Sequence, residues 1–274
     1  MMIVKSGILS EKTLIKSHFL RRSVRVELFI PADIDPAYAR LLLINDGQNM
    51  EELGLASILD QFNNVAPLNL ICVAIHAGAE RKLEYGIADH PDYKNRGTKA
   101  TAYTSFILQE LLPYLYKHFD VTCFASHSFA GFSLGGLSAL DIVWSNPELF
   151  NTAGVFSGSL WWRSKDQHEN DYNDDVHRIM HQQIRNSIFH PGQRFFFQCG
   201  NMDETKDRNQ NGIIDSIDDT LDLIKELELK GYQKEKDIFY LEMPDGKHDI
   251  NTWARAMPVF ISWLQFIDQP ASSF

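Results

Sequence analysis

The sequence predicts one α/β domain over residues 1–274, in which helices cover both faces of a mostly parallel central sheet. Short uninterrupted apolar runs are typical of strands that are buried on both faces of such a sheet. Segments with apolar residues at helical spacing lie between these runs. The chain has 274 residues, of which 44% are hydrophobic and 23% are charged, and this is enough apolar material for one large core.

The strands are expected in the following order. Residues 23–30 (SVRVELFI) alternate apolar and polar side chains before a proline, which is typical of a half-buried strand that opens the sheet. Continuous apolar runs bounded by turn residues then predict buried strands. These runs are ARLLLIND at 39–46, LNLICVAIH at 68–76, TAGVFSGS at 152–159, RFFFQCG at 194–200 and DIFYLEM at 237–243.

Helices are expected between these strands. Residues 100–118 carry apolar side chains at helical spacing, with Pro113 as a local bend. Residues 128–146 predict a strand, a tight glycine turn and a helix that ends before a proline. Further along, the sequence predicts a polar loop and one helix within 163–186, a helix from about 218 to 230 closed by Gly231, and a terminal helix after Asp249.

Charge and composition exclude several classes of function. The formal net charge is −10 at pH 7, so the chain would repel a phosphate backbone, and nucleic acid is not expected as a partner. No secretory signal or membrane-spanning run is visible, so a cytoplasmic location and no membrane partner are expected. The buried settings of Cys72 and Cys199 predict structural thiols, and no zinc motif is present. The oligomeric state stays open.

The segment GFSLGG at 131–136 fits the GxSxG pattern of a nucleophile elbow. An apolar strand precedes it and a helix follows it, which is the context that the pattern requires. Such a turn exposes a serine hydroxyl above the sheet of an α/β-hydrolase fold. Ser133 is therefore the predicted catalytic nucleophile.

A serine nucleophile needs a base, and in this fold the base follows the last strand. His248 occupies that place in MPDGKHDINTW. The third member of a triad is expected after the preceding strand, where Asp203 and Glu204 stand side by side. Asp203 is the predicted acid, which would orient His248 and stabilise the imidazolium, and Glu204 is the alternative.

Two backbone amides are expected to form an oxyanion hole. One belongs to Leu134, the residue after the nucleophile. The other should follow an early central strand, where Gly47 and Gln48 lie in LLLINDGQN. We assign the second amide to Gln48, with Gly47 allowing a close backbone approach, although a simple turn would also explain this glycine.

Several segments together resemble the Putative esterase family, which includes the esterase D and enterochelin esterase-like α/β-hydrolases. The resemblance covers most of the chain and rests on LLLINDGQN, AERKLEYG, FILQELLPYLYKHFDV, AGFSLGGLSAL, NPELFNTAGVFSGSLWW, CGNMD and GKHDINTW. It implies hydrolysis of esters or thioesters through an acyl-enzyme, with the triad and amides named above. The phenylalanines at 129 and 132 depart from the polar residue that other members often place beside the serine.

Two further groups have open interpretations. Trp161 and Trp162 follow a strand at the edge where ligands bind in open α/β sheets, so they either wall an acyl pocket or complete the core. Arg81 and Glu84 are expected to pair locally or to hold a loop beside the cleft, without a catalytic role.

Residues 207–218 match a calcium loop. The ligands of such a loop occupy positions 1, 3, 5, 7, 9 and 12, with glycine at position 6. The predicted ligands are Asp207, Asn209, Asn211, the carbonyl of Ile213, Asp215 and Asp218. A solvated turn before a helix is the alternative. If Ca²⁺ binds, its expected role is structural, and no cofactor is expected for catalysis.

The predicted function is therefore a serine esterase that uses Ser133, and its expected partner is a small-molecule ester substrate. Two alternatives keep the same fold. One is a binding protein without catalytic activity, in which the tryptophans and the acidic loop present a surface. The other is an acyltransferase that passes the acyl group from the same serine to an alcohol.

Overall fold

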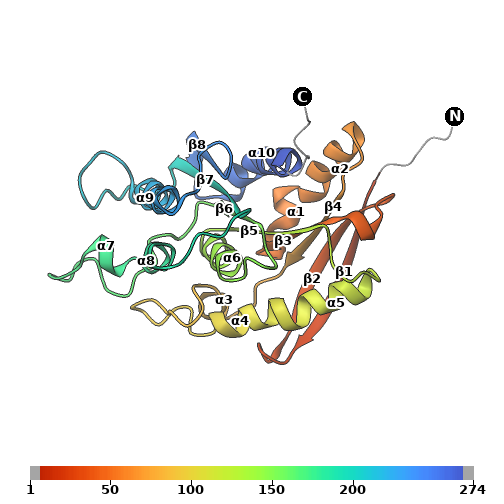
Figure 1. Cartoon of the computed structure of the whole chain (residues 1–274), viewed down its shortest axis with the longest axis horizontal. Helices are drawn as coiled ribbons and strands as arrows, with labels where there is room; N and C mark the ends of the chain where they lie inside the picture. Colours follow the sequence, from red (N-terminus) through yellow and green to blue (C-terminus); the bar gives the residue numbers. More distant parts are fainter. Residues whose placement is uncertain (1–6, 268–274) are drawn as a thin grey trace.

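The computed structural model describes residues 7–267, and its centre is one eight-stranded sheet (Figure 1). The strand order is β1-β2-β4-β3-β5-β6-β7-β8. Strand β2 is antiparallel to β1 and β4, and the remaining pairs are parallel. The prediction of a mostly parallel sheet is confirmed. The strands are β1 Ile8–Ser17, β2 Arg22–Pro31, β3 Arg40–Asn45, β4 Leu70–Ile75, β5 Ser126–Phe132, β6 Thr152–Phe156, β7 Arg194–Met202 and β8 Ile238–Lys247.

Helices cover both faces of this sheet (Figure 1). Helices α1, α2 and α10 lie on one face, and the other helices lie on the opposite face. The helices are α1 Met50–Leu53, α2 Leu55–Val65, α3 Arg81–Glu84, α4 Ala100–Phe106, α5 Leu112–His118, α6 Leu134–Ser145, α7 Asp174–His177, α8 Ile179–Asn186, α9 Asp215–Lys230 and α10 Ile250–Ile267, with short turns η1 Pro36–Tyr38, η2 Gly47–Asn49 and η3 Ile107–Leu111.

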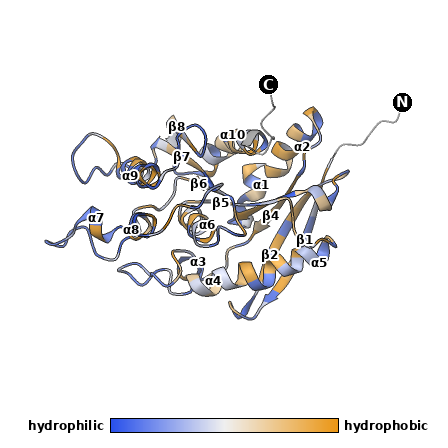
Figure 2. Ribbon diagram, in the orientation of Figure 1, coloured by the Kyte–Doolittle hydropathy of each residue, from blue (hydrophilic) through white to orange (hydrophobic). Residues whose placement is uncertain are grey.

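The central strands are buried on both faces because their side chains alternate between two cores. In β3, Leu41 and Leu43 join the core under α4, α5 and α6, whereas Leu42 and Ile44 join the core under α2 and α10. This alternation explains the uninterrupted apolar runs in the sequence. Hydrophobic residues accordingly dominate the sheet centre in Figure 2. Cys72 is buried and carries a free thiol, as Cys199 does.

Three expectations need correction. The sheet opens with β1, not with residues 23–30, because a mostly exposed antiparallel strand has little apolar signal. The polar segment 163–186 contains α7 as well as α8. Helix α9 begins at Asp215 rather than near 218. The helical segment 100–118 has a π-helical turn, η3, just before Pro113, at the place where a bend was expected.

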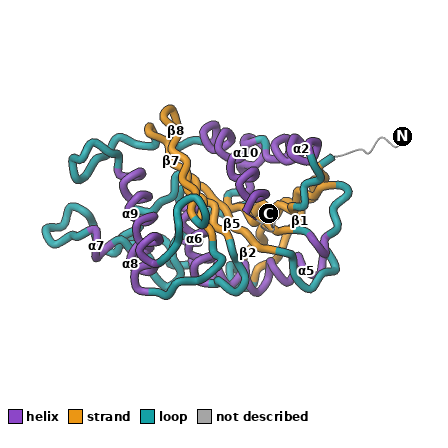
Figure 3. Tube along the Cα trace, turned by 45° about the horizontal axis from the view of Figure 1, so that its top comes forward, coloured by secondary structure: helices purple, strands orange, loops and turns teal. Residues whose placement is uncertain are grey.

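Two long loops project at the end of the molecule that lies farthest from β1. One loop surrounds α7 and the other precedes α9 (Figures 1 and 3). Both are largely hydrophilic (Figure 2). Among the described residues, no helix is both long and apolar enough to cross a bilayer.

Candidate active site

Strained backbone marks the ends of three neighbouring strands. Asp46, Ser133 and Ser157 directly follow β3, β5 and β6, and their φ angles are 62°, 54° and 44°. A positive φ is uncommon outside glycine and persists only where the surrounding structure enforces it. We call the region where β3, β5, β6, β7 and β8 end the carboxyl edge. Three of the nine described non-glycine residues with positive φ follow strands at this one edge, which makes it the candidate functional site.

Ser133 occupies the predicted turn between β5 and α6, with φ 54° and ψ −121°. Its backbone N–H donates to the Phe156 carbonyl of β6 at 2.8 Å. A Cβ on Gly131 would lie 2.3 Å from the Gly135 carbonyl oxygen, so only glycine allows α6 to approach β5 so closely. Ser133 immediately precedes α6, whose N-terminal partial charge favours developing negative charge. The turn therefore has the geometry of a nucleophile elbow.

His248 lies in the short connection between β8 and α10, as predicted. Its ring meets Trp253 edge to face, with ring centroids 5.3 Å apart, and Trp253 stacks on Phe132 at 5.0 Å. Because Phe132 precedes Ser133, this aromatic stack ties the histidine to the elbow. Crowding by protein lowers the pKa of His248 although the side chain remains accessible to solvent, Asp203 raises that pKa, and Arg81 lowers it.

Asp203 directly follows β7, so its carboxylate lies at the same edge. Its Oδ2 accepts the Gly200 N–H at 3.1 Å, whereas its buried Oδ1 has no hydrogen-bond partner among the described residues. Burial raises the pKa of Asp203, and the Gly200 N–H, the nearby Ser157 hydroxyl and the charge of His248 oppose this shift. The unpartnered oxygen is thus available to a histidine ring N–H.

Within residues 7–267, His248 forms no hydrogen bond to Ser133 or to Asp203. Catalytic hydrogen bonds are often long before a substrate is bound. Glu204 has a different environment: burial and the charge of Asp215 raise its pKa, and its side chain lines a cavity beside Lys206. The geometry therefore favours Asp203 over Glu204 as the acid.

The two predicted oxyanion amides lie on adjacent strands. Leu134 is the first residue of α6 after β5, and Gln48 lies in η2 after β3, which pairs with β5. The first N–H groups of a helix have no partner within it. A Cβ on Gly47 would lie 2.8 Å from the Ala74 backbone carbon, so the close approach expected of this glycine is present.

The side-chain amide of Gln48 is occupied by hydrogen bonds within the protein and does not point to a substrate as a donor. Its Nε2 donates to Asp46 Oδ1 at 3.0 Å, and its Oε1 accepts the Ala77 N–H at 3.0 Å. Both ends of the amide group are thus engaged by neighbouring loops. The backbone N–H is the group of Gln48 that the geometry offers to the site.

The structure separates the two tryptophans. Trp162 is fully buried and donates its indole N–H to the His90 carbonyl at 2.9 Å. Trp161 is half-buried, and it lines a cavity of about 310 Å³ with Arg96, Glu204 and Lys206. One residue of the pair therefore completes the core, and the other walls a cavity.

Two residues near the site were not predicted. Ser159 follows β6, and its Oγ lies 3.4 Å from Ser133 Oγ. Arg96 places its guanidinium 4.6 Å from the centroid of the Trp161 ring. The position of Ser159 after a predicted strand was a usable signal, whereas Arg96 reaches the cavity from a loop far away in the sequence.

Four predicted calcium ligands come together where the loop before α9 meets the first turn of that helix. The carboxylate of Asp218 accepts the side-chain amides of Asn209, at 2.6 Å, and of Asn211, at 2.9 Å. Asp207 accepts the backbone N–H of Asn211 at 3.1 Å. These oxygens are therefore engaged by hydrogen bonds within the loop.

The remaining two positions fit a cation less well. Asp215 accepts the Arg208 backbone N–H at 2.8 Å and forms an ion pair with its guanidinium at 3.2 Å. Ile213 donates its backbone N–H to Asn211 Oδ1 at 2.8 Å. In the part of the chain that the structure describes, no three His, Cys, Asp or Glu side chains are placed to hold a metal ion. Calcium binding therefore stays a prediction.

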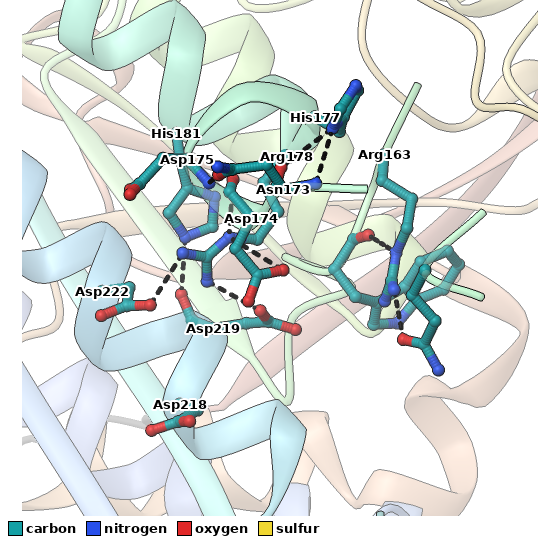
Figure 4. A network of polar contacts seen from close by, with 12 residues as sticks. Arg163, Asn173, Asp174, Asp175, His177, Arg178, His181, Asp218, Asp219 and Asp222 are labelled. Atoms are coloured by element: carbon teal, nitrogen blue, oxygen red, sulfur yellow. Dashed lines mark hydrogen bonds and ion pairs between the residues drawn. The ribbon is translucent and has the colours of Figure 1, made fainter. Parts of the chain in front are cut away.

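A cluster of arginine and carboxylate side chains joins α7, α9 and this loop. Arg178 faces Asp219, at 2.9 Å, and Asp222, at 2.7 Å, and Asp218 points away from it (Figure 4). Arg208 also binds Asp219, at 2.6 Å. We call this cluster the α7–α9 network; its members are Arg178, Arg208, Asp174, Asp219 and Asp222.

Comparisons with solved structures support the fold. The enterobactin esterase of Shigella flexneri, crystallised in the presence of enterobactin, is 22% identical with a TM-score of 0.71 and covers 95% of this chain. A ferulic acid esterase is 16% identical with a TM-score of 0.70, and the match covers 96% of this chain and 99% of the ferulic acid esterase. A siderophore hydrolase from Aspergillus nidulans is 17% identical with a TM-score of 0.67, covering 96% of both chains.

The chain spans about 60% of the length of the Shigella enterobactin esterase. No curated protein sequence matched it. The model of one family, described as "Putative esterase", matches residues 17–264. The predicted α/β-hydrolase fold is thus confirmed, and the chain belongs to the Putative esterase family.

Proposed function

We propose that this chain is a serine esterase that hydrolyses a carboxylic ester or thioester through an acyl-enzyme on Ser133. The observation that carries this proposal is the strained Ser133 turn at the start of α6, with His248 and Asp203 at the ends of β8 and β7. Strained residues of this kind cluster at active sites because a reactive group must be held in one position. Membership of an esterase family supports the same reaction.

The reaction follows from these positions. Ser133 Oγ attacks the ester carbonyl while His248 accepts the hydroxyl proton, and the N–H groups of Leu134 and Gln48 stabilise the oxyanion. His248 then donates the proton to the departing alkoxide or thiolate. A water molecule, deprotonated by the same imidazole, releases the acid and restores Ser133. Asp203 stabilises the imidazolium that forms in each half of the reaction.

The cavity beside Trp161 suggests the class of substrate. Its lining combines the Trp161 indole, against which the Arg96 guanidinium packs, with charged side chains such as Glu204 and Lys206, and its volume is about 310 Å³. An aromatic group can pack beside an indole, and the charged side chains can bind polar substituents on such a group. The solved neighbours named above include a ferulic acid esterase. We therefore propose an aromatic acyl or alcohol group as the part of the substrate that this cavity receives.

A fluorophosphonate probe tests the nucleophile without the natural substrate, because it labels an activated serine. We expect labelling of the wild type and none of Ser133→Ala. Ser159→Ala is the matched control, since Ser159 Oγ lies 3.4 Å from Ser133 Oγ and is not the proposed nucleophile. Equal labelling of wild type and Ser133→Ala would refute the mechanism. Unlabelled but folded wild type would favour the binding protein.

Hydrolysis and acyl transfer are separated by product analysis. Esters of one alcohol with an aromatic or an aliphatic acid, which share the same leaving group, are incubated with the wild type, with and without an added alcohol. Free acid as the main product in both cases is expected. A new ester in the presence of alcohol would assign the same serine to an acyltransferase.

A further inference from the structure

Asp46 lies between β3 and the proposed oxyanion donor Gln48, in a left-handed backbone conformation. The side chain is only 2% exposed. Its Oδ1 accepts Arg81 Nε at 2.6 Å, and its Oδ2 accepts Arg81 Nη2 at 2.7 Å. The same Oδ1 accepts the side-chain amide of Gln48 at 3.0 Å. A bidentate ion pair therefore holds the strained residue that directs the chain toward Gln48.

The same pair reaches the nucleophile elbow. Arg81 Nη2 lies 3.5 Å from the carbonyl oxygen of Phe132, the residue before Ser133. One residue earlier in β3, Asn45 donates its side-chain amide to the carbonyl of Gly135 at 2.8 Å. The end of β3 is thus linked to the backbone on both sides of Ser133 and Leu134.

Two buried tyrosines complete the attachment. The backbone N–H of Asp46 donates to Tyr85 Oη at 3.2 Å, and Tyr103 donates its hydroxyl to Asn45 Oδ1 at 2.5 Å. The Arg81 guanidinium lies over the Tyr85 ring, 4.9 Å from its centroid. Both rings are at most 1% exposed, so these contacts cannot move far.

We propose that the Asp46–Arg81 ion pair is a positioning unit that holds the backbone amides of Gln48 and Leu134 at the separation an oxyanion requires. Neither side chain touches the reacting atoms. The pair acts by keeping η2 at the end of β3 in register with the elbow at the end of β5. This inference rests on the proposed function, because it concerns the amides of that same reaction.

Arg81 has a second effect through its charge. The groups whose charges act on His248 are Asp203, Arg81 and Asp249, and Arg81 lowers the pKa of the imidazole. Loss of this positive charge moves that pKa upward, so a larger fraction of His248 is protonated near neutral pH. Replacement by lysine retains the charge and loses the bidentate contact, which separates the two effects.

The neighbouring ion pair on the same helix is a matched control. Glu84, also in α3, accepts Arg22 Nε at 2.7 Å and Nη2 at 2.6 Å, and its side chain is fully buried. Arg22 is the first residue of β2. Both pairs join a buried carboxylate to a partly exposed arginine, but only the Asp46 pair contacts the elbow.

The test compares Asp46→Asn with Glu84→Gln. Each replacement removes one carboxylate charge and keeps the shape of the side chain. We expect both to lower the melting temperature. Asp46→Asn should lower kcat on an aryl ester by about 100-fold with a small change in KM, because misplaced oxyanion donors cost about that much. Glu84→Gln should keep kcat within about twofold, since its pair does not position these donors.

Arg81 variants provide an independent readout. Arg81→Lys should lose at least about 10-fold in kcat, since it lacks the bidentate contact, and should keep the acid limb of the pH profile in place. Arg81→Met should shift that limb to higher pH. If Asp46→Asn does not fold, Arg81→Lys decides the question.

Three results would overturn the inference. These are kcat within about threefold of wild type in folded Asp46→Asn, an equal loss in Glu84→Gln, or, where Asp46→Asn fails to fold, wild-type kcat in Arg81→Lys. Fluorophosphonate labelling of the wild type separates this failure from failure of the proposed function. A labelled wild type with an unaffected Asp46→Asn refutes only the positioning role, whereas an unlabelled wild type refutes both.

Discussion

The carboxyl edge and the α7–α9 network both contain a buried carboxylate bound by arginine. In the first the carboxylate is linked to the backbone beside the proposed nucleophile, whereas in the second it joins helices and a loop. Asp46 is 2% exposed and Asp219 is 1% exposed. Asp46 follows a strand, has a positive φ, and is linked to the backbone beside Ser133. Asp219 lies within α9 and joins helices and a loop through Arg178 and Arg208.

The difference shows that burial and ion pairing alone do not mark a functional site. Both properties stabilise a fold or fasten a surface segment equally well. What distinguishes the carboxyl edge is that ion pairing coincides with strained backbone at Asp46, Ser133 and Ser157. Variants in the two regions should therefore separate loss of activity from loss of stability.

The largest effect is expected at the carboxyl edge. Asp203→Asn should lower kcat by about 10⁴-fold, because the neutral amide neither fixes the histidine tautomer nor stabilises imidazolium. Glu204→Gln is the matched comparison. Its carboxylate lines the proposed substrate cavity and is not among the charges that act on His248, so it should change KM more than kcat. Steady-state kinetics on one ester measures both. A greater loss in Glu204→Gln would move the acid to Glu204.

In the α7–α9 network the effect should fall on stability. Arg178 is 4% exposed and contacts Asp219 and Asp222, so Arg178→Gln removes one of the two arginines that bind the buried carboxylate of Asp219. Removing one member of a buried ion pair costs about 3–5 kcal/mol of unfolding free energy, and because Arg208 still pairs with Asp219 we expect about 3 kcal/mol, the lower end of that range. Urea denaturation measures this loss, and kcat should stay within about threefold of wild type because the triad is elsewhere. A large fall in kcat at full stability would erase the distinction between the two regions.

A smaller stabilisation is expected from calcium at the loop that borders this network. If Ca²⁺ binds to the folded loop alone, a concentration of 100 times the Kd adds about 2.7 kcal/mol to the free energy of unfolding. Thermal denaturation with and without CaCl₂ measures the gain, and MgCl₂ is the control ion. Asp218→Asn should abolish the gain because it removes a carboxylate that faces Asn209 and Asn211. Equal melting temperatures with and without Ca²⁺ would reject the calcium loop.

The smallest effect is a shift in pH dependence. The proposed base must be neutral, so kcat/KM falls as pH decreases through the pKa of His248. Partial desolvation by the surrounding protein lowers this pKa from its ordinary value of 6.5, and activity should therefore persist below pH 6.5. Asp203→Asn removes a charge that raises the pKa, so its residual activity should persist to still lower pH. An inflection above pH 7 in the wild type would contradict the environment of His248 described above.

Much of the fold was predictable because the apolar patterns in the sequence match the side chains that the fold buries. The runs at 39–46 and 68–76 form the parallel strands β3 and β4, and the glycine turn at 131–136 leads from β5 into α6. Strand β1 was missed because most of its side chains are exposed and only its pairing with β2 makes it a strand. Helix α7 has a single turn, which is too short for an apolar period to be recognised.

In the candidate site, too, some residues could be predicted from the sequence and others could be distinguished only by the structure. Chain order and strand ends predict Ser133 and His248 because a base must follow the nucleophile in this fold. Asp203 and Glu204 are adjacent in sequence, so the sequence does not distinguish them. The geometry at the end of β7 does, because the charge of Asp203 acts on His248 whereas Glu204 lines the cavity. Likewise, nothing in the pair Trp161 and Trp162 shows which indole enters the core.

The sequence by itself determined the fold class, the elbow and the order of the triad candidates, because these depend on short patterns whose physical cause is local. Only the tertiary structure decided which charges meet. Arg81 and Glu84 were expected to pair locally or to hold a loop beside the cleft. They do not pair with each other, because Arg81 binds Asp46 and Glu84 binds Arg22. Such pairings arise when parallel strands bring distant segments to one edge, where burial requires each charge to find a partner.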